Sequence, residues 1–250
     1  MEKKLKRAQA TIFIIIAIVI VVGMVIFFLV RQSVSKPGVS SDTQPIYSFV
    51  EECIKQTGKE VIYSIGETGG YYQLDMPYYY IDGKTYIPTK EEIEKEIAKG
   101  INLELSFCFD DFKNFPDYQT KQGETKTLTK ILDDQVILNV NYPLTITKGE
   151  KTTQFSQFND IKIPIRLGII YTAADEVTQN QLKNQKYSID GKVQETYCLT
   201  CLSEIATAND VDIDTMDYDE ETVIFFISDE ISKINEQPFI FIFANKYQTK

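Results

Sequence analysis

The sequence predicts an α+β fold in which an N-terminal transmembrane helix is followed by extracytoplasmic antiparallel sheets packed with about four helices. Three observations support this. An apolar run without charges occupies residues 11–30. Beyond it, segments with apolar residues at helical spacing are interleaved with segments in which apolar and polar residues alternate. Turn signals such as Asp82-Gly83 separate the strand-like segments, which favours antiparallel hairpins.

The run at residues 11–30 matches a bilayer in length, because about 20 helical residues rise about 30 Å. More basic side chains precede the run than follow it, which places the N-terminus in the cytoplasm and the C-terminal part outside. They are Lys3, Lys4, Lys6 and Arg7 before the run, and Arg31 and Lys36 after it. We therefore expect a single-pass protein of the cell membrane, with a basic leader at 1–8 and a transmembrane helix at 9–31.

The residues at the start of the run read Lys6-Arg7-Ala8-Gln9-Ala10-Thr11. This segment resembles the class III signal of archaeal type IV prepilins, and the resemblance implies that a prepilin peptidase cuts between Ala8 and Gln9. The likeness covers residues 6–30 alone. It departs from bacterial-type pilins at Phe13, where those proteins carry Glu. The whole chain also resembles archaeal proteins with such an anchor and an α+β ectodomain, which implies no particular activity.

Residues 32–44 are rich in Ser, Pro and Gly and predict a linker. A first α+β unit follows at 45–117. An apolar face predicts a helix from Pro45 to about residue 64, and Asp82-Gly83 predicts a hairpin between two extended runs. Thr89 and Glu92 form a capping box that opens a second helix, which reaches about residue 107.

A second α+β unit is predicted at 118–250, and one domain merged with the first unit is the alternative. Two long strands at 135–147 and 152–163 join near Lys148-Gly149. Helices are expected at 168–184 and 191–209. Three strands close the chain at 211–218, 221–228 and 238–247, and the apolar character of the last predicts burial on both faces.

The four cysteines can form disulfides if they lie outside the cytoplasm. Cys53 and Cys108 fall on the apolar faces of the first two predicted helices, and this favours a bond between them. Cys198 and Cys201 form a CxxC motif and can then pair locally. A redox-active pair is one alternative, which the nearby Glu195 disfavours. A zinc site is another, and it would need all four cysteines to converge, because the chain has no histidine.

The acidic run at residues 209–221 has two interpretations. Acids occupy positions 1, 3, 5 and 12 of a calcium loop counted from its first aspartate: Asp210, Asp212, Asp214 and Glu221. Thr215 replaces the usual glycine of that loop, and Asp217 replaces its usual apolar residue. Val211, Ile213 and Thr215 alternate with the acids, which favours a strand. A surface Ca²⁺ site is the alternative, and no other metal or cofactor is expected.

Six of the 15 tyrosines lie close together in the sequence: Tyr71, Tyr72, Tyr78, Tyr79, Tyr80 and Tyr86. Tyrosine is amphipathic and is enriched at binding surfaces, which suggests a recognition surface here. It also favours strands, in which successive side chains alternate between the core and solvent. Both interpretations stay open at this point.

The composition argues against several classes of function. The absence of histidine excludes His-based catalytic triads and His metal sites. The net charge of −10 argues against nucleic acid as a partner. We therefore expect a non-enzymatic surface protein with a binding or structural role, in contact with membrane lipid and with a protein partner or further copies of itself. The alternatives are an anchored thiol-disulfide protein that uses the CxxC motif and a minor pilin-like filament subunit.

Overall fold

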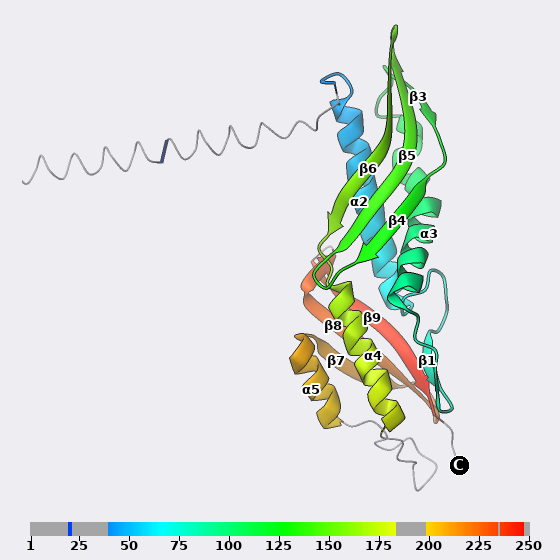
Figure 1. Ribbon diagram of the computed structural model, residues 1–250, viewed down its shortest axis with the longest axis vertical. Coiled ribbons are helices and arrows are strands. Elements are labelled where there is room, and N and C mark those ends of the chain that lie inside the picture. The colour runs from blue at the N-terminus through cyan, green and yellow to red at the C-terminus, as the bar shows by residue number, and fades with distance from the viewer. Residues whose placement is uncertain (1–19, 22–39, 184–198, 235, 248–250) are drawn as a thin grey trace, which may run out of the picture. The chain divides into compact units, whose positions relative to one another are not determined.

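The computed structural model of the chain describes residues 20–21, 40–183, 199–234 and 236–247 (Figure 1). The chain divides into two compact units, Met1–Pro45 and Ile46–Lys250, and the second holds nearly all of the described residues. Two sheets and their helices build it. The helices are α2 (Gln44–Glu67), α3 (Lys90–Phe109), α4 (Leu167–Lys183) and α5 (Leu199–Asn209), with a short 3₁₀ helix at Asp110–Phe112.

The first sheet is antiparallel and has β5 (Val136–Lys148) at its centre. Strand β6 (Lys151–Ile163) pairs with β5 along one edge, and β3 (Gln119–Gln122) and β4 (Lys126–Ile131) pair with it in succession along the other. Alternate residues of β5 from Val136 to Ile146 are buried, so one face of the sheet belongs to the core. Helices α2 and α3 cover that face (Figure 1).

The second sheet has the order β2-β1-β9-β8-β7. Its strands are β1 (Tyr78–Ile81), β2 (Lys84–Thr85), β7 (Asp212–Asp217), β8 (Thr222–Ile234) and β9 (Gln237–Lys246). Strand β1 runs parallel to β9, and the other neighbours are antiparallel. The sheet is therefore mixed, and the prediction of antiparallel sheets alone is wrong at the β1–β9 pair. Helices α4 and α5 lie against one face of it (Figure 1).

Helices α2 and α3 pack closely because small residues stand where they meet their neighbours. A Cβ atom at Gly100 would lie 2.6 Å from Val61 Cγ1, and one at Gly58 would lie 2.6 Å from Leu138 Cδ1. The disulfide between Cys53 and Cys108 that the sequence analysis favours is present and joins these two helices. The core under them is aromatic as well as aliphatic.

The local signals read from the sequence correspond to structure. The Thr89 hydroxyl accepts from the Glu92 amide at 3.2 Å, and the Glu92 carboxylate accepts from the Thr89 amide at 2.7 Å, which is the expected capping box. Asp82 and Gly83 have φ of 49° and 87°, as a type I′ hairpin turn requires. Strands β3 and β4 were not expected, because their polar, threonine-rich residues give little apolar alternation.

The transmembrane helix in the expected fold requires a correction. No helix among the described residues is long and apolar enough to cross a membrane. The expectation rested on the length and lack of charge of residues 11–30 alone, whereas α2 to α5 each combine a buried apolar stripe with a polar face. Of residues 11–30, only Ile20 and Val21 are described. The predicted cleavage site at Ala8 and Gln9 lies outside the described residues.

Candidate functional site

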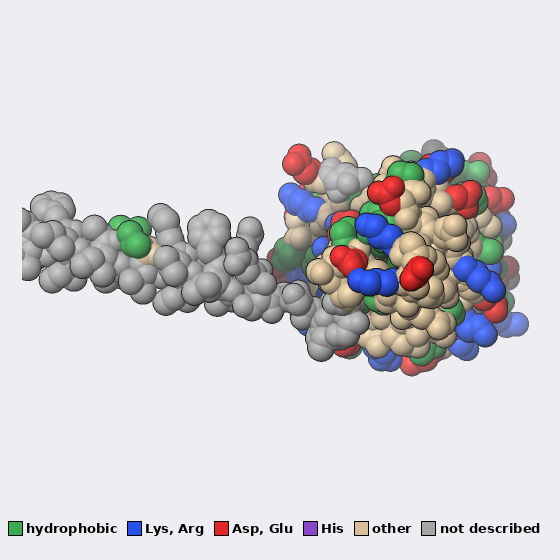
Figure 2. Space-filling view, turned by 90° about the horizontal axis from the view of Figure 1, so that it is seen from above, with side chains coloured by type: hydrophobic (Ala, Val, Ile, Leu, Met, Phe, Trp, Pro, Cys, Tyr) green, Lys and Arg blue, Asp and Glu red, His purple; other side chains and the backbone are tan. Residues whose placement is uncertain are grey.

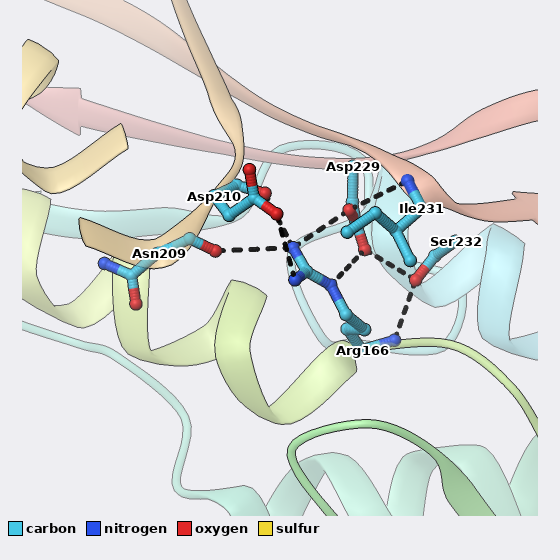
Figure 3. Close-up of polar contacts among 6 residues, drawn as sticks. All are labelled: Arg166, Asn209, Asp210, Asp229, Ile231 and Ser232. Atoms are coloured by element: carbon cyan, nitrogen blue, oxygen red, sulfur yellow. Dashed lines mark hydrogen bonds and ion pairs between the residues drawn. The ribbon is translucent and has the colours of Figure 1, made fainter. Parts of the chain in front are cut away.

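Arg166, just before α4, is the centre of a buried polar network (Figure 3). Its side chain is 14% exposed, and the Asp229 side chain that it faces is 0% exposed. The guanidinium donates to Asp229 Oδ2 from Nε at 3.0 Å and to Asp229 Oδ1 from Nη2 at 3.1 Å. Nη2 also donates to the backbone oxygens of Asn209 at 3.3 Å and Asp210 at 2.6 Å. This forked, charge-assisted geometry is the strongest pairing that these two side chains make.

The Asp229 carboxylate also holds an irregularity in β8. Pairing with β9 shifts between Asp229 and Lys233, so the residues between them leave the ladder. Asp229 accepts from the Ser232 hydroxyl at 2.6 Å and from the Ile231 amide at 3.1 Å, and the Arg166 amide donates to Ser232 Oγ at 2.8 Å. The network therefore fixes three segments together: the start of α4, the turn from α5 to β7, and the bulge in β8.

Two open grooves flank α5, next to this network. The first has a volume of about 420 Å³ and lies between α5 and the β7–β8 edge. It is lined by Ser203, Ala206, Thr207, Asp210, Val211, Asp212, Glu230 and Ile231. Ile231 comes from the bulge and is 61% exposed. Because Asp229 and Ser232 hold the bulge, the network sets the position of this apolar side chain in the groove.

The second groove has a volume of about 490 Å³ and lies between α4 and α5. Its lining residues are Asp175, Glu176, Gln179, Asn180, Glu204, Ile205 and Ala208. Neither groove has a lysine or arginine among its described lining residues, whereas each has three carboxylates. We call the lining residues of both grooves together the α5 face. It presents negative charge around an apolar floor.

The α5 face differs in charge from the end of the described structure where β5 turns into β6. The end of the described structure where β5 turns into β6 carries Lys and Asp or Glu side chains side by side (Figure 2). The turn itself contributes both signs, since Lys148 and Lys151 flank Glu150. Surfaces with interspersed charges are what solubility alone produces.

Comparison of the chain with protein-family models, with curated proteins and with solved structures found no match.

The four acids considered for calcium do not converge. Asp212 and Asp214 lie in β7, as the strand interpretation expected. Asp210 lies 3.8 Å from Arg166 Nη1, and Glu221 pairs with Lys246 at 3.4 Å. No group of three acidic or cysteine side chains among the described residues is arranged to hold a metal ion. Two of the four acids instead belong to the first groove of the α5 face.

The six clustered tyrosines do not form one surface. Tyr79 and Tyr80 are buried, Tyr71 and Tyr78 are half-buried, and Tyr86 is 49% exposed. Burial raises the pKa of Tyr79 well above its ordinary value, and its hydroxyl donates to the Gly69 carbonyl at 3.0 Å.

The side chain of Tyr72 is likewise hydrogen-bonded within the fold. Its hydroxyl donates to Glu104 at 2.6 Å, and this hydrogen bond raises the pKa of Tyr72 to about 12. The buried tyrosines therefore serve the core, which leaves no continuous tyrosine platform for a ligand.

Cys201, the second cysteine of the CxxC motif, lies in the first turn of α5. Cys201 is disulfide-bonded, and Cys198 lies outside the described residues. Helix α5 thus has a covalent constraint in its first turn. That constraint adds to the Arg166 network at the other end of the helix.

Sequence reasoning missed Arg166, Asp229 and Ser232. Two signals were available. Arg166 is the only arginine after Arg31, and Asp229 follows directly on the apolar strand sequence Val223–Ser228. A charged residue inside such a strand predicts a buried partner, but the chain offers many candidate cations, and only the fold selects Arg166.

Proposed function

We propose that this protein is a non-enzymatic, extracytoplasmic binding protein that holds a positively charged partner on the α5 face. The observation that carries the proposal is the set of six carboxylates around the two grooves. They are Asp175, Glu176, Glu204, Asp210, Asp212 and Glu230. Clefts lined by one sign of charge concentrate the opposite charge and steer association.

The neighbouring cations do not neutralise this face. The Arg166 guanidinium is bound to Asp229 and to two backbone oxygens, and its Nη1 also lies 3.8 Å from the carboxylate of Asp210, whose side chain is 81% exposed. Lys233 pairs with Glu230 at 3.3 Å, but both side chains are at least half exposed, so this pair exchanges readily with solvent or a partner. The face therefore keeps a net negative charge.

The apolar floor adds a second feature to the proposed partner. Val211 and Ile205 are buried at the base of the grooves, and Ile231 protrudes beside them. Lysine and arginine carry aliphatic stems that cover apolar surface while their charged ends reach carboxylates. A partner that presents lysine or arginine side chains fits both the charge and the floor.

The face is also held rigid, which favours binding because little order must be gained. The Arg166 network fixes the C-terminal end of α5, and the Cys201 disulfide constrains its first turn. Two disulfide-bonded sites in the chain support an oxidising location outside the cytoplasm.

Titration of the full chain with hexalysine tests the proposal. We expect binding by calorimetry at about 0.1 M salt and loss of most of it near 1 M, where charges are screened within about 3 Å. The variant Glu204→Gln/Asp212→Asn/Glu230→Gln should bind at least about tenfold more weakly, because three carboxylates of the face are gone.

The matched control is Glu52→Gln/Glu67→Gln/Asp117→Asn, which removes the same charge from exposed positions outside the α5 face. It should bind hexalysine as the unmodified chain does. Equal weakening of both variants would show that net charge, rather than the α5 face, attracts the peptide, and the proposal would then be wrong.

A further inference from the structure

We infer that the positively charged partner of the α5 face is a second copy of this chain, docked through the outward face of the first sheet. This inference rests on the proposed function above. The outward face is the side of the first sheet opposite α2 and α3. Its side chains are mainly uncharged polar residues and lysines.

The outward face is open to solvent. The outward residues of the central strand β5, from Ile137 to Thr147, are half-buried. Those of the flanking strands are exposed, among them Leu128, which is 74% exposed. No described helix covers this side, as Figure 1 shows for β5 and β6 in front of α2.

Uncharged polar side chains fill the middle of the outward face in cross-strand rows. Asn141 lies opposite Gln157, Thr145 opposite Gln154, and Thr147 opposite Thr152. Directly opposite residues point to the same side of an antiparallel sheet, so the amides and hydroxyls form one array. Such groups donate and accept hydrogen bonds without repelling a carboxylate by charge.

Lysines provide the charge of the outward face. Register places Lys121 beside Thr145, Lys126 beside Asn141, and Lys130 and Lys162 on either side of Ile137. Lys126 lies 3.7 Å from Glu124 in an exposed pair, and Lys130 lies 3.2 Å from Glu94, whose side chain is only 13% exposed, whereas both lysines are themselves exposed. One aspartate, Asp160, lies beside Asn139. Four lysines stand beside three acids here, Asp160, Glu124 and Glu94, so this region has an excess of positive charge on a chain whose net charge is −10.

The outward face and the α5 face complement each other in two respects. Lysines meet carboxylates, and exposed Leu128 with half-buried Ile137 on one face corresponds to exposed Ile231 on the other. The two faces are different surfaces of one chain, so their contact is heterologous: each copy offers one face to a neighbour and keeps the other free. Contacts of this kind build rings or open rows of molecules rather than a closed twofold dimer.

A complementation experiment tests the inference. The sheet variant Lys121→Gln/Lys130→Gln/Lys162→Gln keeps its α5 face, and the groove variant Glu204→Gln/Asp212→Asn/Glu230→Gln keeps its outward face. Mass is measured by sedimentation velocity of the full chain in nonionic detergent, because residues 11–30 could otherwise associate independently of charge. The unmodified chain should associate at about 0.1 M salt and dissociate near 1 M.

Each variant alone should remain monomeric, and an equimolar mixture should form a heterodimer that grows no further, since only one intact pair of faces remains. The control Lys55→Gln/Lys84→Gln/Lys95→Gln should associate as the unmodified chain does. An unmodified chain that stays monomeric, variants that associate alone, or a mixture that does not combine would each overturn the inference. If hexalysine still binds the α5 face in those cases, the proposed function stands and only the identity of the partner is wrong.

Discussion

Replacement of Asp229 by asparagine is the most informative single change in this fold. It removes the charge that the Arg166 guanidinium faces while nearly preserving the shape of the side chain. Asp229 is fully buried and Arg166 is 14% exposed, so water cannot replace the lost carboxylate. The change also weakens the acceptor for Ser232 and Ile231, which hold the β8 bulge.

The expected loss follows from these contacts. Breaking a buried ion pair by removing one partner costs about 3–5 kcal/mol. The backbone oxygens of Asn209 and Asp210 still accept from Arg166, which favours the lower end of that range. We expect the free energy of unfolding to fall by about 3 kcal/mol, and the melting temperature of a domain of this size to fall by about 6–12 °C.

Urea denaturation followed by circular dichroism measures this loss, since the chain has no tryptophan. The control Asp217→Asn, at an exposed position in β7, should change stability by less than about 0.5 kcal/mol. The double variant Arg166→Met/Asp229→Leu should recover most of the stability, because it leaves no unpaired charge. A loss below about 1 kcal/mol for Asp229→Asn, or a double variant no better than the single one, would refute this reasoning.

Three further predictions concern the helix pair α2–α3. Replacing both cysteines of the Cys53–Cys108 disulfide by serine should lower the free energy of unfolding by about 4 kcal/mol in urea, because the bond closes a loop with a sequence separation of 55. Gly100→Ala should destabilise by about 1–3 kcal/mol despite the better helix propensity of alanine, since its Cβ would meet Val61 Cγ1 at 2.6 Å; an unchanged urea midpoint would contradict the close packing. The raised pKa of Tyr72 means that its stabilising contribution is complete below about pH 10 and is lost as pH rises through about 12. The difference in phenolate absorbance between the unmodified chain and Tyr72→Phe should therefore titrate near pH 12, and a midpoint near 10 would show that Glu104 does not hold the phenol.

Most local structure could be read from the sequence, because its causes are local. The capping box at Thr89 and Glu92 involves residues three positions apart, and the turn at Asp82 depends on the following glycine. The long strand β5 alternates buried apolar and less buried residues, whereas the buried residues Phe155, Phe158 and Ile161 of β6 are three positions apart. The strand interpretation of residues 211–218 was also favoured over a calcium loop, and β7 lies there.

The candidate site could not be predicted from local sequence patterns, because residues distant in the sequence form it. Arg166 and Asp229 are separated by 63 residues, and no local pattern links them. The parallel pairing of Tyr78 with Ala244 likewise joins distant segments. The grooves gather acids from α4, α5, β7 and β8, so the α5 face exists only once those four elements are packed. The clustered tyrosines, by contrast, were close in sequence but separate on folding into core and surface.

The parallel pairing of β1 with β9 has a consequence for the order in which the chain acquires its structure. Both helices of the disulfide-bonded pair α2–α3 end by Phe109, so the segment that carries both cysteines is complete before the strands β5 and β9, against which α2 packs, have been synthesised. The second sheet is different: β1 waits for β9, which is made last. Until then, β1 and its tyrosines lie at an unpaired edge, a state that favours wrong pairing between chains. A chain truncated before Gln237 would remain in that state permanently.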